Sequence, residues 1–229
     1  TVAIGDIQAA NGNPNSGYVS IYNWSGVSWN QIGQDIDGEV VGDQSGYSVS
    51  LSSDGNTVAI GAPIHNNGNG GNSGHVRIYN WSGSFWNQLG QDIDGEASGD
   101  WSGNSVSLSS DGNTVAIGAE GNDGNGTNSG HVRIYNWNGS NWTQLGQDID
   151  GEASGDLSGS SVAISSDGNT VVIGSPSNAG NGVDAGHVRI YNYNGSSWVQ
   201  IGNDIDGEAS GDLSGHSVSI SSDGNTVAI

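Results

Sequence analysis

The sequence predicts an all-β fold, a β-propeller whose four-stranded antiparallel blades each come from one repeat of about 56 residues. The repeat shows in the tetrapeptide Thr-Val-Ala-Ile, or Thr-Val-Val-Ile in one copy, which begins at positions 1, 57, 114, 170 and 226. Between these landmarks, short segments alternate apolar and polar residues with the period of a strand. The 41 glycines are spread through every segment, and each would cost about 1 kcal/mol inside a helix. Helices are therefore not expected.

The repeats divide the chain into four units and the start of a fifth, at residues 1–56, 57–113, 114–169, 170–225 and 226–229. The extra residue of the second unit falls between Gly61 and Gly74, in an Asn/Gly tract where a surface loop tolerates insertion. A β-solenoid-like stacked repeat array is the alternative architecture, although solenoid coils are usually shorter and hold fewer strands. Because the pattern begins and ends inside a unit, we expect a piece of a longer or self-assembling array, with copies joining into a larger ring or a filament.

Four segments in each unit have the alternation and the β-branched and aromatic content of strands. In chain order, examples are Gly74–Trp81, Trp86–Ile93, Ser105–Ser109 and Thr114–Ile117. Tight hairpins are predicted where Asp54-Gly-Asn56 and its copies separate two such segments. Within a blade we expect the Ser-Val-Ser-Leu-Ser strand to lie innermost and the Trp86–Ile93 strand outermost.

Two stretches, Gly42-Asp-Gln-Ser-Gly-Tyr-Ser-Val-Ser-Leu51 and Thr57-Val-Ala-Ile-Gly-Ala-Pro63, resemble the FG-GAP repeat of integrin alpha chains and of bacterial and algal surface proteins. The landmarks of that family are a Phe-Gly before the first strand and a Gly-Ala-Pro after the second. Here only Gly61-Ala-Pro63 keeps the tripeptide, the family's aspartate-rich calcium loop is shortened to Ser-Ser-Asp-Gly-Asn, and the Phe is replaced by Ser45, Ser102, Ser158 and Ser214. The resemblance implies a propeller in an extracellular, adhesive setting.

The most regular motif is the loop Asp-Ile-Asp-Gly-Glu-x-x-Gly-Asp, which occurs four times and holds sixteen of the 24 acidic residues. Ca²⁺ takes about six to eight oxygen ligands, and clustered carboxylates repel one another unless a cation or salt intervenes. The candidate calcium ligands are Asp35, Asp37, Glu39, Asp43, Asp92, Asp94, Glu96, Asp100, Asp148, Asp150, Glu152, Asp156, Asp204, Asp206, Glu208 and Asp212. In the alternative interpretation, Asp-Gly simply turns the chain between blades, and the carboxylates are solvated or cap backbone N–H groups.

The tryptophans flank the second hairpin of each unit, as in the pair Trp81 and Trp86. Because the chain has one Phe and no Met, we expect these rings to pack between blades, where each buries about 150–250 Å². Exposed, they would instead stack on sugar rings. Asn-x-Ser/Thr sequons, which would accept glycans in a secreted eukaryotic protein, occur at Asn23, Asn80, Asn125, Asn138, Asn141 and Asn194.

Composition limits the function. The formal charge of −21 disfavours nucleic acid and anionic membrane surfaces. No apolar run approaches the roughly 20 residues of a membrane helix, so no membrane insertion is expected. Without cysteine there are no disulfides, and we expect an extracellular or cell-surface location on the strength of the family resemblance.

No catalytic residues are predicted, because no Ser-His-Asp set stands out from the repeat background and the chain has neither Cys nor Lys. The recurring His75, His131 and His187 and the recurring Arg77, Arg133 and Arg189 are expected to serve structure, each Arg by pairing with a carboxylate. Three functions stay open. They are a structural or adhesive module, which we favour, a glycan-binding propeller, and a scaffold for an enzyme domain outside this sequence.

Overall fold

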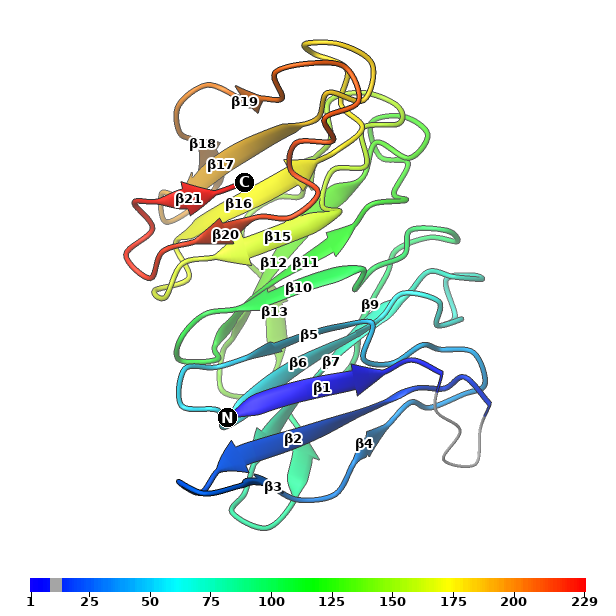
Figure 1. The fold of residues 1–229 in the computed structure, drawn as a ribbon. Helices are drawn as coiled ribbons and strands as arrows, with labels where there is room; N and C mark the ends of the chain where they lie inside the picture. Colours follow the sequence, from blue (N-terminus) through cyan, green and yellow to red (C-terminus); the bar gives the residue numbers. More distant parts are fainter. Residues whose placement is uncertain (9–13) are drawn as a thin grey trace.

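The computed structural model describes residues 1–8 and 14–229 as antiparallel sheets stacked face to face along the chain, without helices among these residues (Figure 1). We call the sheets blades 1 to 4, in chain order. Blade 1 holds β1 (Val2–Asp6), β2 (Tyr18–Trp24), β3 (Trp29–Gln31) and β4 (Ile36–Asp37); blade 2 holds β5 (Ser48–Leu51), β6 (Thr57–Ala62), β7 (His75–Trp81), β8 (Trp86–Gln88) and β9 (Ile93–Asp94). Blade 3 holds β10 (Ser105–Leu108), β11 (Thr114–Ala119), β12 (His131–Trp137), β13 (Trp142–Gln144) and β14 (Ile149–Asp150); blade 4 holds β15 (Ser161–Ile164), β16 (Thr170–Ser175), β17 (His187–Tyr193), β18 (Trp198–Gln200) and β19 (Ile205–Asp206); β20 (Ser219–Ile220) and β21 (Val227–Ala228) form a further pair.

The predicted all-β class and the antiparallel order are confirmed, and one strand differs from the prediction. The segment Trp86–Ile93 is two strands, because β8 pairs with one end of β7 and β9 with the other. Between them the chain bends out at Gly90, which has a φ of 80°, a backbone conformation that favours glycine. The same break recurs in every blade, so the outermost edge is one interrupted strand.

The Ser-Val-Ser-Leu strands lie innermost, as predicted, and they connect one blade to the next. The backbone N–H of Leu108 donates to Ser50 Oγ (3.0 Å), and that of Ile164 donates to Ser107 Oγ (3.1 Å). Ser48 Oγ donates in turn to the carbonyl of Gly103 (2.7 Å). Serine at these positions therefore supplies hydrogen bonds between neighbouring sheets that apolar residues could not make.

The hydrophobic core lies between blades. At the first junction it consists of residues from both sheets: Val19, Ile21 and Ile36 of blade 1, and Val58, Ile60, Tyr79 and Trp86 of blade 2. The alternation predicted for β7 holds, since Tyr79 packs toward blade 1 while Val76 and Ile78 pack toward blade 3. Blades 2 and 3 bury both faces of their thin sheets, and so each depends on its two neighbours for stability.

The tryptophans of the outer strands join the blades, as predicted. The indole N–H groups of Trp86, Trp142 and Trp198 each donate to a carbonyl of the preceding blade, at Ile32 (2.9 Å), Leu89 (2.8 Å) and Leu145 (2.7 Å). Trp86 and Trp198 are buried, whereas Trp24 and Trp29 of blade 1 are about half exposed. A buried indole needs such a hydrogen-bond acceptor.

The two glycine landmarks meet at the junctions. A Cβ on Gly61, in the Gly-Ala-Pro position, would lie 2.1 Å from the carbonyl oxygen of Gly103, in the Phe-Gly position of the next blade. Gly118 and Gly159 are related in the same way, at 2.0 Å. Ser102, which replaces the family's Phe, is fully buried, and a Cβ on Gly95 would lie 3.0 Å from Ser102 Cβ.

The two ends of the chain lie at opposite ends of the stack (Figure 1). β20 pairs with β21, while β1 pairs with β2. The inner strand β20 therefore pairs with β21 and not with β1. The hydrogen-bonded sheets are offset from the sequence repeats, since each innermost strand belongs to the unit before. None of the described residues form a helix long and apolar enough to cross a membrane.

Candidate functional site

The carboxylates of each acidic loop differ in their contacts. The last one folds back on its own loop. Asp100 is buried and accepts the backbone N–H groups of Glu96 (3.1 Å) and Ala97 (2.8 Å). Asp43 makes the same pair of contacts and also bonds His65 Nδ1 through its other oxygen (2.9 Å). The expectation that some of these carboxylates cap backbone N–H groups is confirmed here.

The glutamates of the first three loops each reach an arginine of the next blade. Glu96 Oε1 lies 3.3 Å from Arg133 Nη1, and Arg133 Nη2 donates to the carbonyl of Asp94 (2.7 Å). The arginine is buried and stands 5.6 Å from the ring centroid of Tyr135, within the range of a cation–π contact. The predicted pairing of each Arg with a carboxylate is confirmed, and its setting is more buried than an ordinary surface ion pair.

The first aspartate of each loop approaches the recurring histidine of its own blade. Nδ1 of His75 lies 3.7 Å from Asp92 Oδ2, Nδ1 of His131 lies 3.9 Å from Asp148 Oδ2, and Nδ1 of His187 lies 3.7 Å from Asp204 Oδ2. The other oxygen of each aspartate accepts a glutamine amide four residues earlier, as in Gln144 and Asp148. In blade 1, Tyr18 takes the place of the histidine, and Asp35 accepts from Ser20 Oγ (2.9 Å).

The histidines are neutral in this setting. Burial, followed by nearby His65 and Arg77, lowers the pKa of His75 to about 3. Burial and Arg133 lower the pKa of His131 to about 4, and burial together with Arg189 also lowers the pKa of His187. An imidazole without its proton charge keeps a lone pair for a hydrogen-bond donor or a metal ion.

The carboxylates of one loop thus do not gather around one point. Among the described residues, the acidic and histidine groups whose ligand atoms lie within 4.8 Å of one another are Glu39–His65–His75, His75–Asp92–Asp94, Glu96–His131–Asp148 and Glu152–His187–Asp204. Each contains a histidine, and three of them combine two blades. The calcium prediction for the sixteen loop carboxylates stays a prediction. The histidines were missed as ligand candidates, although their recurrence with an aspartate 17 positions later, as in His131 and Asp148, is visible in the sequence.

A second feature is a hollow of about 440 Å³ where the inner strands begin. Tyr47, Asn104, Ser160 and His216 stand at equivalent positions of the repeat, and all four line it, together with Leu157 and Leu213. These positions differ between repeats that are otherwise nearly identical. Trp101, Leu157 and Leu213 have φ angles of 55°, 56° and 53°, which are unfavourable for bulky side chains.

Comparison with known proteins agrees with this geometry. The family model described as "FG-GAP repeat" matches residues 93–135, from β9 through the acidic loop to the middle of β12. This segment is similar to the FG-GAP repeat. The matched segment includes Glu96, Asp100 and His131, and its counterparts recur along the chain. No curated protein sequence matches.

Among solved structures, TolB from Acinetobacter baumannii superimposes with a TM-score of 0.54 at 14% sequence identity. The superposition covers 99% of this chain and 45% of TolB, so the chain spans less than half the length of that protein. At this identity the likeness shows the fold alone. With the FG-GAP repeat it confirms the predicted β-propeller type.

Proposed function

We propose that this chain is a non-catalytic structural or adhesive module of an extracellular or cell-surface protein, in which further FG-GAP blades extend the stack. One observation carries the proposal. Blade 1 leaves exposed the face that blade 2 buries against its neighbour. Val2, Ile4 and Trp29 are 37%, 55% and 51% exposed, while their counterparts Val58, Ile60 and Trp86 are 0%, 1% and 4% exposed.

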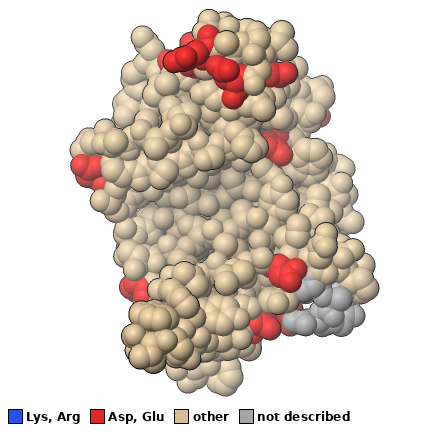
Figure 2. Space-filling view, viewed as in Figure 1, with Lys and Arg blue, Asp and Glu red and all other residues tan. Residues whose placement is uncertain are grey.

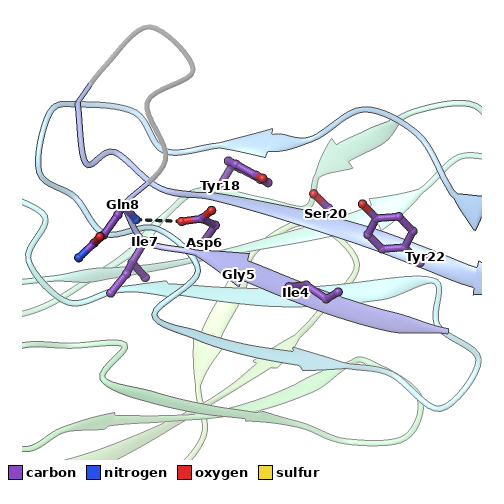
Figure 3. A pocket seen from close by; sticks show the side chains of 8 residues that line it. All are labelled: Ile4, Gly5, Asp6, Ile7, Gln8, Tyr18, Ser20 and Tyr22. Atoms are coloured by element: carbon purple, nitrogen blue, oxygen red, sulfur yellow. Dashed lines mark hydrogen bonds between the residues drawn. The ribbon is translucent and has the colours of Figure 1, made fainter. Parts of the chain in front are cut away.

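The exposed face of blade 1 resembles one side of a junction between two blades. A groove of about 510 Å³ is lined by Val2, Ile4, Tyr22 and Trp29. Beside it lies a second groove of about 420 Å³, in which Tyr18, Ser20 and Tyr22 of β2 line up next to β1 (Figure 3). The counterparts of Tyr18 and Ser20 are His75 and Arg77, which receive the acidic loop of the blade before. The occupant that fits is therefore another blade of this repeat, from a second copy or from a chain continuous with this one.

The surface chemistry supports a module exposed to solvent. All three arginines are buried, and the face in Figure 2 shows acidic side chains in separate patches around a largely uncharged middle. A net charge this far from zero favours solubility. The six sequon asparagines are exposed, so each would be open to a glycosyltransferase.

The test is the oligomeric state of the purified chain. Self-association that rises with concentration in light scattering is expected, and Ile4→Asp should abolish it by placing a charge in the apolar groove. Val27→Asp is the matched control, because Val27 is 87% exposed and lines neither of the two grooves. A chain that stays monomeric at all concentrations, or an Ile4→Asp variant that associates like the control, would contradict the proposal.

Calcium binding at the sixteen loop carboxylates belongs to the same proposal. Bound calcium should raise the melting temperature, because an ion that binds only the folded state stabilises it. Sodium chloride at matched ionic strength controls for screening of the carboxylates. Equal shifts with both salts would leave the loops as solvated turns.

Glycan binding is the second candidate, and the hollow beside the inner strands favours it. Positions that vary between near-identical repeats are free of the demands of the fold, and here they gather in one hollow with aromatic, amide and imidazole groups. Such groups stack on sugar rings and bond hydroxyls. A glycan array should then find ligands whose binding falls in Tyr47→Ala and persists in Tyr18→Ala, which lies on the face of blade 1.

A further inference from the structure

At each junction between consecutive blades, a buried histidine faces carboxylates that come from two different blades. We call Glu96–His131–Asp148 and Glu152–His187–Asp204 the junction triads. The three ligand atoms of each triad lie within 4.8 Å of one another. The glutamate belongs to the loop that enters the blade, and the histidine and aspartate belong to the blade itself. The set therefore exists only when two blades are packed together.

The spacing within a triad is too long for hydrogen bonding and fits an ion between the groups. Nδ1 of His187 lies 3.7 Å from Asp204 Oδ2 and 4.0 Å from Glu152 Oε2, while N–H···O bonds measure about 2.7–3.2 Å. Two ligand atoms bound tetrahedrally at about 2.0–2.2 Å from one zinc ion lie about 3.4 Å apart. Small side-chain movements would bring the triad to that distance.

The buried histidines are a second observation at these sites. His75, His131 and His187 are each 1% exposed. Both ring nitrogens of His75 are buried without a hydrogen-bond partner, and in His131 and His187 the buried atom without a partner is Nε2. An ion at Nδ1 would give that atom of His75 a partner, and in each imidazole it would place the proton on Nε2.

The arginine beside each triad leaves room for an ion. Arg189 Nη1 lies 3.5 Å from Glu152 Oε1, so the pair uses one carboxylate oxygen, and Oε2 is the one turned toward His187. Two carboxylates against one guanidinium keep the triad net negative.

We propose that the junction triads bind a divalent transition-metal ion of the zinc class, which cross-links consecutive blades through histidine Nδ1 and two carboxylate oxygens. Nitrogen together with oxygen donors suits Zn²⁺ and its neighbours, whereas Ca²⁺ takes only oxygen ligands and needs six to eight of them. Three protein ligands leave a fourth position for water. The inference stands apart from the proposed stacking of further blades, since it concerns junctions inside the chain.

The first junction offers a related set around His75. It adds His65 and Asp94 to Glu39 and Asp92, and the rings of His65 and His75 stack with centroids 3.9 Å apart. Stacked rings cannot both aim their in-plane lone pairs at one ion without turning. We therefore expect a site there on His75 and its aspartates, and the experiment below leaves this junction unchanged.

The test compares two variants with the same loss of charge in the same loops. Asp148→Asn with Asp204→Asn removes one ligand from both triads, while the amide oxygen can still accept the neighbouring glutamine. Asp150→Asn with Asp206→Asn is the control, because these two residues belong to no group of close ligand atoms. The full chain, freed of metal with a chelator, is titrated with Zn²⁺ by calorimetry, and Co²⁺ absorption reports nitrogen and oxygen ligation.

The wild type and the control should bind about three ions, and the triad variant about one. The wild type should also gain more in melting temperature from Zn²⁺ than the triad variant does. Three outcomes would overturn the proposal: no Zn²⁺ binding in the wild type, equal stoichiometry in the two variants, or Ca²⁺ and Zn²⁺ stabilising the wild type equally. A failure here would leave the oligomeric state untouched, so the two proposals are tested separately.

Discussion

At the scale of single residues, two buried serines of the same repeat differ in their hydrogen bonding. Ser109 Oγ accepts the backbone N–H of Thr114 (2.9 Å) and donates to Asp111 (2.6 Å). Ser102 is equally buried, but its Oγ has no hydrogen-bond partner. It stands where the FG-GAP family has Phe.

These two serines make a matched pair for mutation. Ser102→Ala should leave the free energy of unfolding unchanged or raise it. The variant removes a hydroxyl that loses its contacts with water on folding and gains no hydrogen bond in exchange. Ser109→Ala should lower it by about 1–2 kcal/mol, since Thr114 N–H loses its acceptor. Urea unfolding of both variants decides. Equal losses would show that Ser102 has a bond in solution.

Strained backbone at the hollow makes a second prediction. Leu157 has a φ of 56°, where Asn is tolerated much better than Leu. At another turn of the repeat, the same conformation is filled by Asn15, Asn72, Asn128 and Asp184. Leu157→Asn should therefore raise the free energy of unfolding by about 1 kcal/mol. If Leu157→Asn also weakens glycan binding, the strained leucine contributes to the binding site. A loss of stability in this variant would mean that the packing of Leu157 outweighs the backbone strain.

At the scale of elements, the hairpin at the end of each inner strand is held by one aspartate. Asp167 Oδ1 accepts from Ser165 Oγ (2.6 Å) and from the backbone N–H of Asn169 (3.0 Å). These bonds, that of Ser165 foremost, lower the pKa of the Asp167 carboxyl, and those of Ser52 and Asn56 lower the pKa of Asp54. The tight Asp-Gly-Asn hairpins predicted from the sequence are therefore confirmed, and the hydrogen bonds to the aspartate carboxylate explain why they form.

The lowered pKa values fix the sign of a pH effect. A carboxyl group with a lower pKa in the folded state stabilises the fold above its unfolded pKa of about 3.9, and this contribution disappears as pH falls through the folded pKa. Asp54→Asn with Asp167→Asn should cost a few tenths of a kcal/mol per exposed site at pH 7, and the difference from wild type should shrink below about pH 4. Thermal melts from pH 7 to pH 3 measure it. A difference independent of pH would mean that the charge contributes nothing.

The sequence predicts those parts of the structure whose contacts repeat with the period of the chain. Strands, hairpins and the tryptophan contacts repeat with the period of the chain, so one unit predicts them all. The break at Gly90 was missed because Leu89 and Ile93 continue the alternation on both sides of it. The His131 site was missed because its glutamate belongs to the unit before, and a motif search within one loop cannot combine ligands across a junction.

At the scale of the whole molecule, stability is a sum of blades and junctions. Each blade packs mainly on its neighbours, so a weakened junction should separate the stack into parts that unfold independently. Blades 3 and 4 come close together at Gly118, where a Cβ would lie 2.0 Å from the carbonyl oxygen of Gly159. The same contact is repeated at the other junctions, so a substitution at Gly118 weakens one junction and leaves the others intact.

Gly118→Ala should therefore cost on the order of 3 kcal/mol and change the unfolding from one transition to two, with blade 4 exchanging its amide hydrogens before blades 1 and 2. Gly68→Ala is the matched control, since a Cβ at Gly68 meets nothing within 4 Å. Hydrogen exchange followed by mass spectrometry resolves the blades, because their peptides are separate in sequence. Faster exchange spread evenly over all four blades would show that the stack unfolds as one cooperative unit, and the additive picture of blades and junctions would then be wrong.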